Sequence, residues 1–315
     1  MNKVILFPGQ GSQSVGMGKN LYENFRCAKD VFDEVDDALG QKLSKIIFEG
    51  PEEDLTLTEN TQPALMTVSM AVMRILEKEF DIVPAQHFTY AAGHSLGEYS
   101  ALCCSHVFSL ADTARLLKIR GTSMQKAVPV GQGAMAAIIN LSFDKIADIT
   151  QTVATDTGQY CDIANDNSEG QIVISGHKEA IDKACDIAKS AGAKRALLLP
   201  VSAPFHSGLM QPAAVAMEAA LSEVTMQDAD MPVIANVSVT PVTVVDDIRK
   251  ALIAQVTGRV RWRETMAYFA DNNIETAIEA GSGKVLTGLL KRAMKDVQLV
   301  NLQNPDDIEL YAKSA

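Results

Sequence analysis

The sequence predicts an α/β protein in which a large domain is interrupted by a smaller inserted one. Short apolar runs with the character of buried strands recur between segments with helical spacing. One of these runs leads directly into the sequence GHSLG at residues 93–97. Between residues 128 and 199 the pattern changes to the order βαββαβ, which predicts the insertion. A chain of 315 residues has room for one large and one small domain.

The N-terminal segment begins with a buried strand at residues 4–7, which Pro8 and Gly9 end. A polar, glycine-rich loop follows at residues 9–18 and leads into helices. Proline and acidic residues at positions 51–55 are typical of a helix start. We expect the helices of this part at residues 21–39, 63–79 and 110–125.

Residues 93–97 match G-x-S-x-G, the pattern of a nucleophile elbow between a strand and a helix. An apolar strand at 88–92 precedes the motif and a helix from about residue 96 follows it, which makes a chance match less credible. At such a turn the hydroxyl of Ser95 is exposed, and the helix N-terminus faces the place where an oxyanion would form. The motif therefore predicts an α/β-hydrolase-like large domain with a parallel sheet, and acyl transfer through an ester of Ser95.

A Pro/Gly-rich linker at residues 128–133 marks the start of the insertion. The order βαββαβ is the ferredoxin-like pattern. We therefore expect a ferredoxin-like small subdomain at 128–199, and a discontinuous large domain at 1–127 and 200–315. The expected strands of the insertion are 134–141, 161–165, 171–175 and 195–199, and its helices are 144–155 and 178–191. After residue 200 we expect strands at 233–236 and 276–279 and helices at 246–255, 263–270 and 283–292.

Composition limits the classes of function. The net charge of −11 argues against a nucleic-acid ligand, because neutralising phosphates requires a basic surface. The chain has five cysteines in irregular spacing and no C-x-x-C, which favours a reducing cytoplasm over a disulfide framework or a zinc site. The first apolar run is too short for a signal peptide, and no run approaches a membrane span. We expect a soluble, cytoplasmic protein without a metal.

A serine nucleophile needs a general base, and the chain has five histidines. His94 adjoins Ser95 in the turn, where neighbouring side chains point apart. His206 follows the last strand of the insertion, where the chain re-enters the large domain and faces the cleft between the domains. The order Ser before His also fits this fold. His206 is the candidate base, and a structural loop histidine is the alternative. The remaining histidines are His87, His106 and His177.

Two glycine-rich stretches only partly match phosphate loops. Residues 9–14 lack the third glycine of G-x-G-x-x-G, and residues 281–285 lack the upstream glycine and the Ser/Thr of a P-loop. A nucleotide cofactor is therefore disfavoured. The first loop suits donation of backbone N–H groups to an oxyanion.

Arg120 lies near the end of the expected helix at 110–125. A surface arginine is the ordinary interpretation. The functional interpretation is a bidentate clamp for a substrate carboxylate.

Several short motifs occur in one order along nearly the whole chain. They are FPGQGSQ at 7–13, GHSLGEY at 93–99, IRG at 119–121, GQGAMAA at 131–137, Asn165 with Asn167, PFH at 204–206, Gln255 before VRW at 260–262, and GSGKVL at 281–286. As a set they resemble the malonyl-CoA:acyl carrier protein transacylase family, although no single motif would decide it.

The resemblance implies a ping-pong mechanism in which Ser95 is the nucleophile and His206 its base. Malonyl-CoA acylates the serine, CoA leaves, and the malonyl group passes to the phosphopantetheine thiol of holo-acyl carrier protein. The main-chain carbonyl of Gln255 would orient the histidine in place of an aspartate. The backbone N–H groups of Gln10 and Leu96 would form the oxyanion hole.

The same resemblance implies the substrate contacts. Arg120 would pair with the free carboxylate of malonate, so that a neutral acyl group would leave a buried guanidinium unpaired. Phe205 would crowd out an α-methyl group, and Asn165 would line the cleft. Ser282 stands where many relatives have proline, and Phe205 where some have serine, which affects acyl selectivity rather than the reaction type.

The carrier protein is acidic, so a basic patch on this acidic chain is a further expectation. Candidates are Lys189, Lys194, Arg195, Lys284, Lys291 and Arg292, with ordinary solvated side chains as the alternative for any one of them. We expect a monomer that binds no cofactor. Three other functions remain open: an acyltransferase for polyketide assembly or malonate decarboxylation, an esterase or thioesterase, and a non-catalytic binding protein.

Overall fold

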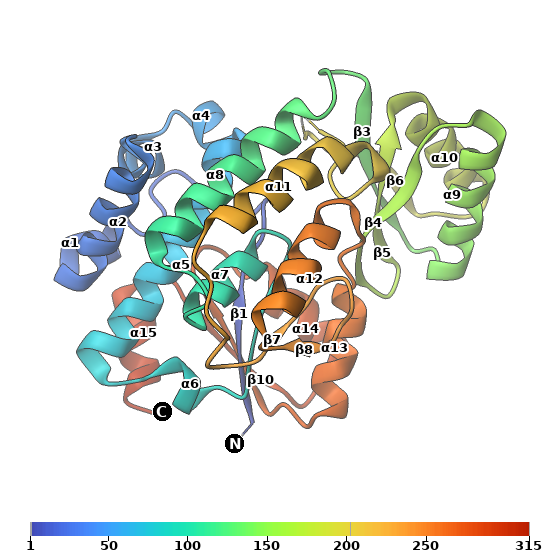
Figure 1. Ribbon diagram of the computed structural model, residues 1–315. Helices are drawn as coiled ribbons and strands as arrows, with labels where there is room; N and C mark the ends of the chain where they lie inside the picture. The colour runs from blue at the N-terminus through green and yellow to red at the C-terminus, as the bar shows by residue number, and fades with distance from the viewer. Residues whose placement is uncertain (1, 202, 315) are drawn as a thin grey trace.

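The computed structural model describes residues 2–201 and 203–314 and confirms the α/β class. Two sheets lie side by side, a six-stranded sheet within a shell of helices and a four-stranded sheet at one end of the molecule (Figure 1). Within the described part of the chain, no helix is long and apolar enough to cross a membrane.

The larger sheet has the strand order β10-β9-β1-β2-β7-β8. Its first five strands run parallel, and β8 pairs antiparallel with β7 at one edge. The central pair is in a register that sets Phe7 beside Gly93, so the strand ends that carry the two loops of interest are adjacent. The strands are β1 (Lys3–Phe7), β2 (Tyr90–Gly93), β7 (Val233–Ile234), β8 (Pro241–Val242), β9 (Thr276–Ala280) and β10 (Gln298–Leu302).

Both faces of this sheet are buried, as expected for parallel strands. Along β1, Val4 and Leu6 pack with Trp262 against one group of helices, while Ile5 and Phe7 join the main core on the other face. The first group is α13 (Trp262–Asp271) and α14 (Val285–Ala293). The main core contains α2 (Arg26–Leu39), α5 (Thr58–Phe80), α7 (Gly97–Cys104), α8 (Leu110–Lys126), α11 (Gln211–Glu223), α12 (Val245–Thr257) and α15 (Pro305–Ala312). Shorter helices are α1 (Lys19–Asn24), α3 (Leu43–Glu49), α4 (Glu52–Thr56), α6 (Pro84–His87) and the 3₁₀ turn η1 (Gly208–Met210).

Two of the expected helices differ from the structure. The single helix expected at 21–39 is wrong, because Phe25 adopts an extended conformation and separates α1 from α2. Helix α5 begins at Thr58 instead of residue 63, and Pro63 lies inside it. Proline is best tolerated at the first turn of a helix, which is why the sequence suggested a later start.

The four-stranded sheet is antiparallel with the order β4-β5-β3-β6, which is the ferredoxin-like arrangement. Its outer face packs on α9 and α10, and Met135 and Val173 on its other face join the main core. The elements are β3 (Gly133–Ile139), α9 (Phe143–Thr157), β4 (Cys161–Ser168), β5 (Gln171–His177), α10 (Lys178–Ser190) and β6 (Arg195–Leu198). The domain boundaries at 128 and 199 stay a prediction.

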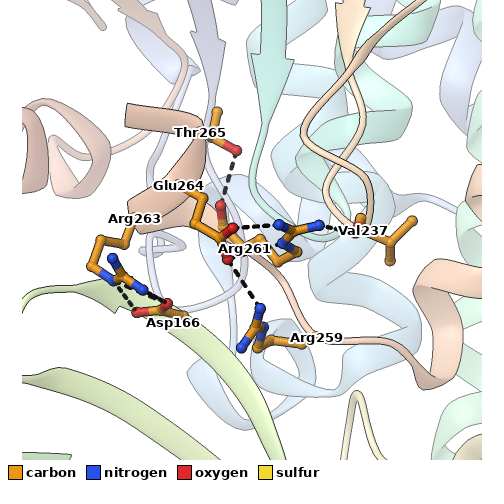
Figure 2. A network of polar contacts seen from close by, with 7 residues as sticks. All are labelled: Asp166, Val237, Arg259, Arg261, Arg263, Glu264 and Thr265. Atoms are coloured by element: carbon orange, nitrogen blue, oxygen red, sulfur yellow. Dashed lines mark hydrogen bonds and ion pairs between the residues drawn. The ribbon is translucent and has the colours of Figure 1, made fainter. Parts of the chain in front are cut away.

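A seam of backbone and charged contacts joins β4 to the segment before α13. Val260 donates to the carbonyl of Ala164 at 2.8 Å, and its own carbonyl accepts from the N–H of Asp166 at 2.9 Å. The Asp166 carboxylate is fully buried and binds Arg263 at 2.8–3.1 Å (Figure 2). These contacts hold β4, which carries two asparagines of interest, against α13 and the segment before it.

The same seam contains a carboxylate shared by two arginines. Glu264 accepts from Arg259 at 3.0 Å and also from Arg261, whose guanidinium reaches the Val237 carbonyl at 3.1 Å (Figure 2). Within the seam each arginine therefore has a direct anionic partner.

Candidate active site

The sharp turn that carries Ser95 depends on glycine at both flanking positions. Ser95 has a φ of 54°, a left-handed conformation that is strained for a residue with a side chain. A Cβ at Gly93 would lie 1.9 Å from the Gly97 carbonyl oxygen, and one at Gly97 would lie 2.3 Å from that of Phe7. Only glycine permits β1, β2 and α7 to approach so closely, which confirms the elbow that the motif predicts.

Ser95 and His206 form a hydrogen-bonded pair, with 2.7 Å between Oγ and Nε2. The other ring nitrogen, Nδ1, lies 2.9 Å from the carbonyl oxygen of Gln255 and 3.0 Å from that of Gly258. Because a carbonyl only accepts, Nδ1 carries the proton and Nε2 is free to accept the serine proton. The structure thus brings together the two residues that the sequence linked, 111 positions apart.

His206 is 3% exposed, and this burial governs its ionisation. Burial first, and then the positive charge of Arg120, lower the pKa of His206 to about 3. The imidazole is therefore neutral near pH 7, as a general base must be.

Arg120 reaches the same serine from within α8 (Leu110–Lys126). Its Nη2 lies 3.1 Å from the Ser95 Oγ and 2.8 Å from the Gln255 side-chain oxygen, and its Nη1 lies 2.8 Å from that of Gln62. The guanidinium is 1% exposed, and its Nε–H has no hydrogen-bond partner among the residues that the structure describes. Burial lowers the pKa of Arg120, while the Glu98 carboxylate opposes that shift. The surface-arginine interpretation is wrong, because the residue is buried beside the candidate nucleophile.

A cavity of about 120 Å³ opens over this group. Seven of the candidate residues line it: Gln10, Ser95, Leu96, Arg120, Asn165, Phe205 and His206. The eighth, Gln255, lies beneath it and contacts both His206 and Arg120. Leu96 is the N-cap position of α7, so its backbone lies at the positive end of that helix.

Of the other histidines, His94 lines the same cavity but has its own partner. The side chain of His94 points away from Ser95 and pairs with Asn167 of β4 at 2.8 Å. His106 binds Asp230 at 2.7 Å, and His177 stacks on Tyr160.

Sequence reasoning missed three residues that hold the site. Asn236 accepts from the Ser95 N–H and donates to the Gly93 carbonyl, both at 2.8 Å. Gln62 binds Arg120, and Glu98 lies buried under the elbow. Glu98 falls within the motif at 93–99, and its position directly after G-x-S-x-G was a signal that could have marked it. Asn236 and Gln62 have no local sequence signal.

Comparison with known proteins shows the family to which the chain belongs. The chain belongs to the acyl transferase domain family, whose model matches residues 4–308. It is 46% identical over 311 residues to the malonyl CoA-acyl carrier protein transacylase of Bacillus subtilis, covering 98% of this chain and 96% of that protein. The protein of the same name from Escherichia coli K12 is 45% identical over 300 residues, or 95% of each chain.

Solved structures agree with these relatives. The crystal structure of acyl-carrier-protein-S-malonyltransferase from Bartonella henselae superposes with a TM-score of 0.97 at 54% identity, covering 100% of this chain and 99% of that one. A malonyl-transacylase solved in complex with a type II polyketide acyl carrier protein gives 0.95 at 39% identity, covering all of both chains. The chain is therefore an acyltransferase of the malonyl CoA-acyl carrier protein transacylase family, which confirms the resemblance seen in its motifs.

Proposed function

We propose that the chain transfers the malonyl group of malonyl-CoA to the phosphopantetheine thiol of holo-acyl carrier protein through a malonyl-Ser95 ester, for fatty acid chain elongation. One observation carries the catalytic part of this proposal. The Ser95 oxygen lies 2.7 Å from a neutral imidazole nitrogen and 3.1 Å from a buried guanidinium. The nucleophilic oxygen of Ser95 is thus within hydrogen-bond distance of both its base and the cation for the substrate carboxylate.

In the first half-reaction Ser95 Oγ attacks the thioester carbonyl of malonyl-CoA while His206 Nε2 takes the hydroxyl proton. The N–H groups of Gln10 and Leu96 stabilise the oxyanion. The intermediate collapses, the carbon–sulfur bond breaks, and the imidazolium returns its proton to the CoA sulfur. The product is malonyl-Ser95 and free CoA.

The second half-reaction runs the same steps with the other thiol. His206 takes the proton of the phosphopantetheine thiol, whose sulfur attacks the ester carbonyl. The ester bond breaks, and the imidazolium returns the proton to Ser95 Oγ. The mechanism uses groups of this protein, one thioester substrate and one thiol substrate, and no bound metal or cofactor enters it.

Acyl selectivity follows from the groups around the cavity. Arg120 binds the free carboxylate of malonate, and a neutral acetyl group would leave that guanidinium without an anion. Phe205 limits the space for an α-methyl group, and Asn165 closes the side formed by β4.

The acyl carrier protein would bind where basic residues of both parts of the chain meet. Lys194, before β6, and Arg292, at the end of α14, line one groove of about 520 Å³. Lys189 already pairs with Asp186 at 3.2 Å and is a weaker candidate. Reversing both charges, Lys194→Glu with Arg292→Glu, should raise the KM for the carrier about tenfold and leave that for malonyl-CoA unchanged. Lys19→Glu, on α1 at the far end of the molecule (Figure 1), is the matched control. Equal effects on both substrates would contradict this docking surface.

The proposal also includes the cellular location and the oligomeric state of the enzyme. A reducing cytoplasm suits the five unpaired cysteines, and the chain acts there as a monomer without membrane attachment.

The first experiment is intact-protein mass spectrometry after brief incubation with malonyl-CoA, alongside Ser95→Ala, followed by holo-acyl carrier protein. We expect a malonyl adduct that is absent from the variant and moves to the carrier. Free malonate without an adduct would mean a hydrolase. The absence of both an adduct and turnover would contradict the proposal.

A polyketide carrier is the second candidate acceptor, because the chain superposes on a transacylase solved with such a carrier. Comparing kcat/KM for a fatty-acid and a polyketide holo-carrier distinguishes the two pathways.

A further inference from the structure

A buried carboxylate lies directly beneath the elbow. Glu98, in the first turn of α7, is 1% exposed. Its Oε2 accepts hydrogen bonds from the backbone N–H of Asn236 at 3.1 Å and from the side-chain Nε2 of Gln255 at 2.8 Å. The mechanism above gives Glu98 no part, yet both of its partners hold the elbow.

Asn236 holds the elbow from one side. Its Oδ1 accepts from the N–H of Ser95 and its Nδ2 donates to the carbonyl of Gly93, each at 2.8 Å. One side chain thereby fixes the strained turn through two hydrogen bonds.

Gln255 holds the other side and connects three further groups. Its Nε2 donates to the Ser95 carbonyl at 2.9 Å, its Oε1 accepts from Arg120 at 2.8 Å, and its main-chain carbonyl accepts from His206 at 2.9 Å. A carboxamide has one donor end and one acceptor end, so its orientation decides which group faces Arg120.

Glu98 favours the same orientation as the Ser95 carbonyl and Arg120 do. The Asn236 N–H can only donate, so the Glu98 oxygen that faces it must be an acceptor. The same oxygen faces Gln255 and therefore selects its Nε2 end, which turns Oε1 toward Arg120. With the amide reversed, Nε2 would face the guanidinium, donor against donor, and Oε1 would face the Ser95 carbonyl.

We infer that Glu98 is a positioning residue for acyl transfer: by accepting from Asn236 and Gln255 together, it holds Ser95 and Arg120 in their reactive arrangement. This inference rests on the proposed roles of Ser95, His206 and Arg120. Burial raises the pKa of Glu98 to about 7, and Arg120 is the charged group that opposes the shift. A buried carboxyl costs free energy that an apolar side chain would not, so it fits a site whose geometry depends on it.

The first test compares two variants that differ only in the acceptor oxygen. Glu98→Gln keeps an oxygen that can accept from both donors, whereas Glu98→Met has similar length and no acceptor. We expect Glu98→Met to lower kcat/KM for malonyl transfer about 100-fold, and Glu98→Gln to stay within about fivefold of wild type. A fall in Glu98→Gln as large as in Glu98→Met, or wild-type activity in Glu98→Met, would overturn the inference.

Glu279 provides the matched control for loss of stability. It is also fully buried and accepts from the N–H groups of Leu286 and Thr287 at the start of α14, away from the cavity. Glu279→Met should lower the melting temperature by a similar amount and leave kcat/KM of the folded enzyme unchanged. An equal loss of activity in Glu279→Met would mean that lost stability explains the effect of Glu98→Met, and this would overturn the inference.

A swap of the two side chains tests the orientation itself. Gln255→Glu alone would set a carboxylate against the Ser95 carbonyl and Glu98, and should lower kcat/KM about 100-fold. Adding Glu98→Gln removes one of the two facing negative charges while its oxygen still accepts from Asn236, and should recover about tenfold. Additive effects of the two substitutions would overturn the inference. Formation of the malonyl adduct by wild type, and its absence in Ser95→Ala, show separately whether the proposed function holds.

Discussion

Arginine is held in two contrasting ways in this molecule. In the seam beside β4, Arg263 pairs with the buried Asp166, and Arg261 pairs with Glu264. In the active site, Arg120 is held by the neutral side-chain oxygens of Gln62 and Gln255. Within the described residues, no carboxylate lies within ion-pair distance of Arg120, and its Nε–H has no partner.

The pKa values follow this difference. The hydrogen bonds that Arg261 and Arg263 donate to their carboxylate partners raise the pKa of both arginines. Burial lowers the pKa of Arg120, and the Glu98 carboxylate, which does not pair with it directly, only opposes that shift. The seam arginines have their counter-ions within the fold and serve its stability. In the proposed mechanism, Arg120 binds the anion that arrives with the substrate.

Arg120→Met should separate activity from stability most strongly. We expect kcat/KM for malonyl-CoA to fall about 1,000-fold, since the substrate carboxylate would be buried without a partner. Acetyl transfer should change far less, and the melting temperature should not fall, because Arg120 makes no direct ion pair with a carboxylate of the described residues. Steady-state rates with both thioesters and a thermal melt check this. Equal losses for malonyl and acetyl would contradict the clamp.

Arg263→Met should show the opposite behaviour. It leaves the Asp166 carboxylate buried and unpaired, so we expect the free energy of unfolding to fall by about 4 kcal/mol. Denaturant unfolding measures this, and adding Asp166→Asn should restore most of the loss because it removes the charge. If the double variant is no more stable than Arg263→Met, the pair does not stabilise the seam in this way.

Glu98→Gln should alter the pH dependence of stability. The pKa of Glu98 is raised from 4.5 to about 7, so its protonated form favours folding. Its contribution is fully present below pH 4.5 and is lost as the pH rises through 7. Relative to wild type, Glu98→Gln should therefore gain on the order of 3 kcal/mol of unfolding free energy between pH 4.5 and pH 8. Chemical denaturation at both pH values checks this, and a constant difference would contradict the raised pKa.

Glu264→Gln should give the smallest effect, with the opposite sign. Hydrogen bonding to Arg261 lowers the pKa of Glu264. Its contribution to stability is present above the unfolded value of 4.5 and is lost as the pH falls through the lowered folded value. Because the side chain is 29% exposed, we expect a loss of about 1 kcal/mol at pH 7. The loss should vanish in acid, and a pH-independent loss would argue against the charged pairing.

The sequence predicted those parts of the fold and site that depend on local pattern. The elbow could be predicted because its two glycines and the strand before it are contiguous in sequence. The βαββαβ order of the small sheet likewise followed from alternating strand and helix patterns. The predicted roles of Ser95, His206 and Arg120 relied on motif order, and the structure adds their mutual distances.

The remaining features depend on contacts between distant segments. Strand β10 and helix α15 were not expected, because β10 is recognisable mainly through its pairing with β9 at the sheet edge. Asn236 holds the elbow from 141 residues away, and Gln62 holds Arg120 from 58 residues away. A single asparagine or glutamine in a sequence carries no sign of such a partner.

The orientation of His206 by two peptide carbonyls has a consequence for mutational robustness. A histidine oriented by an aspartate loses its partner through one codon change. Here the acceptors belong to the main chain at Gln255 and Gly258, and every amino acid brings a carbonyl to such a position. His206 can therefore keep its proton on Nδ1 when the side chains around it are substituted. Its orientation depends on the path of the backbone and not on the identity of a neighbouring side chain.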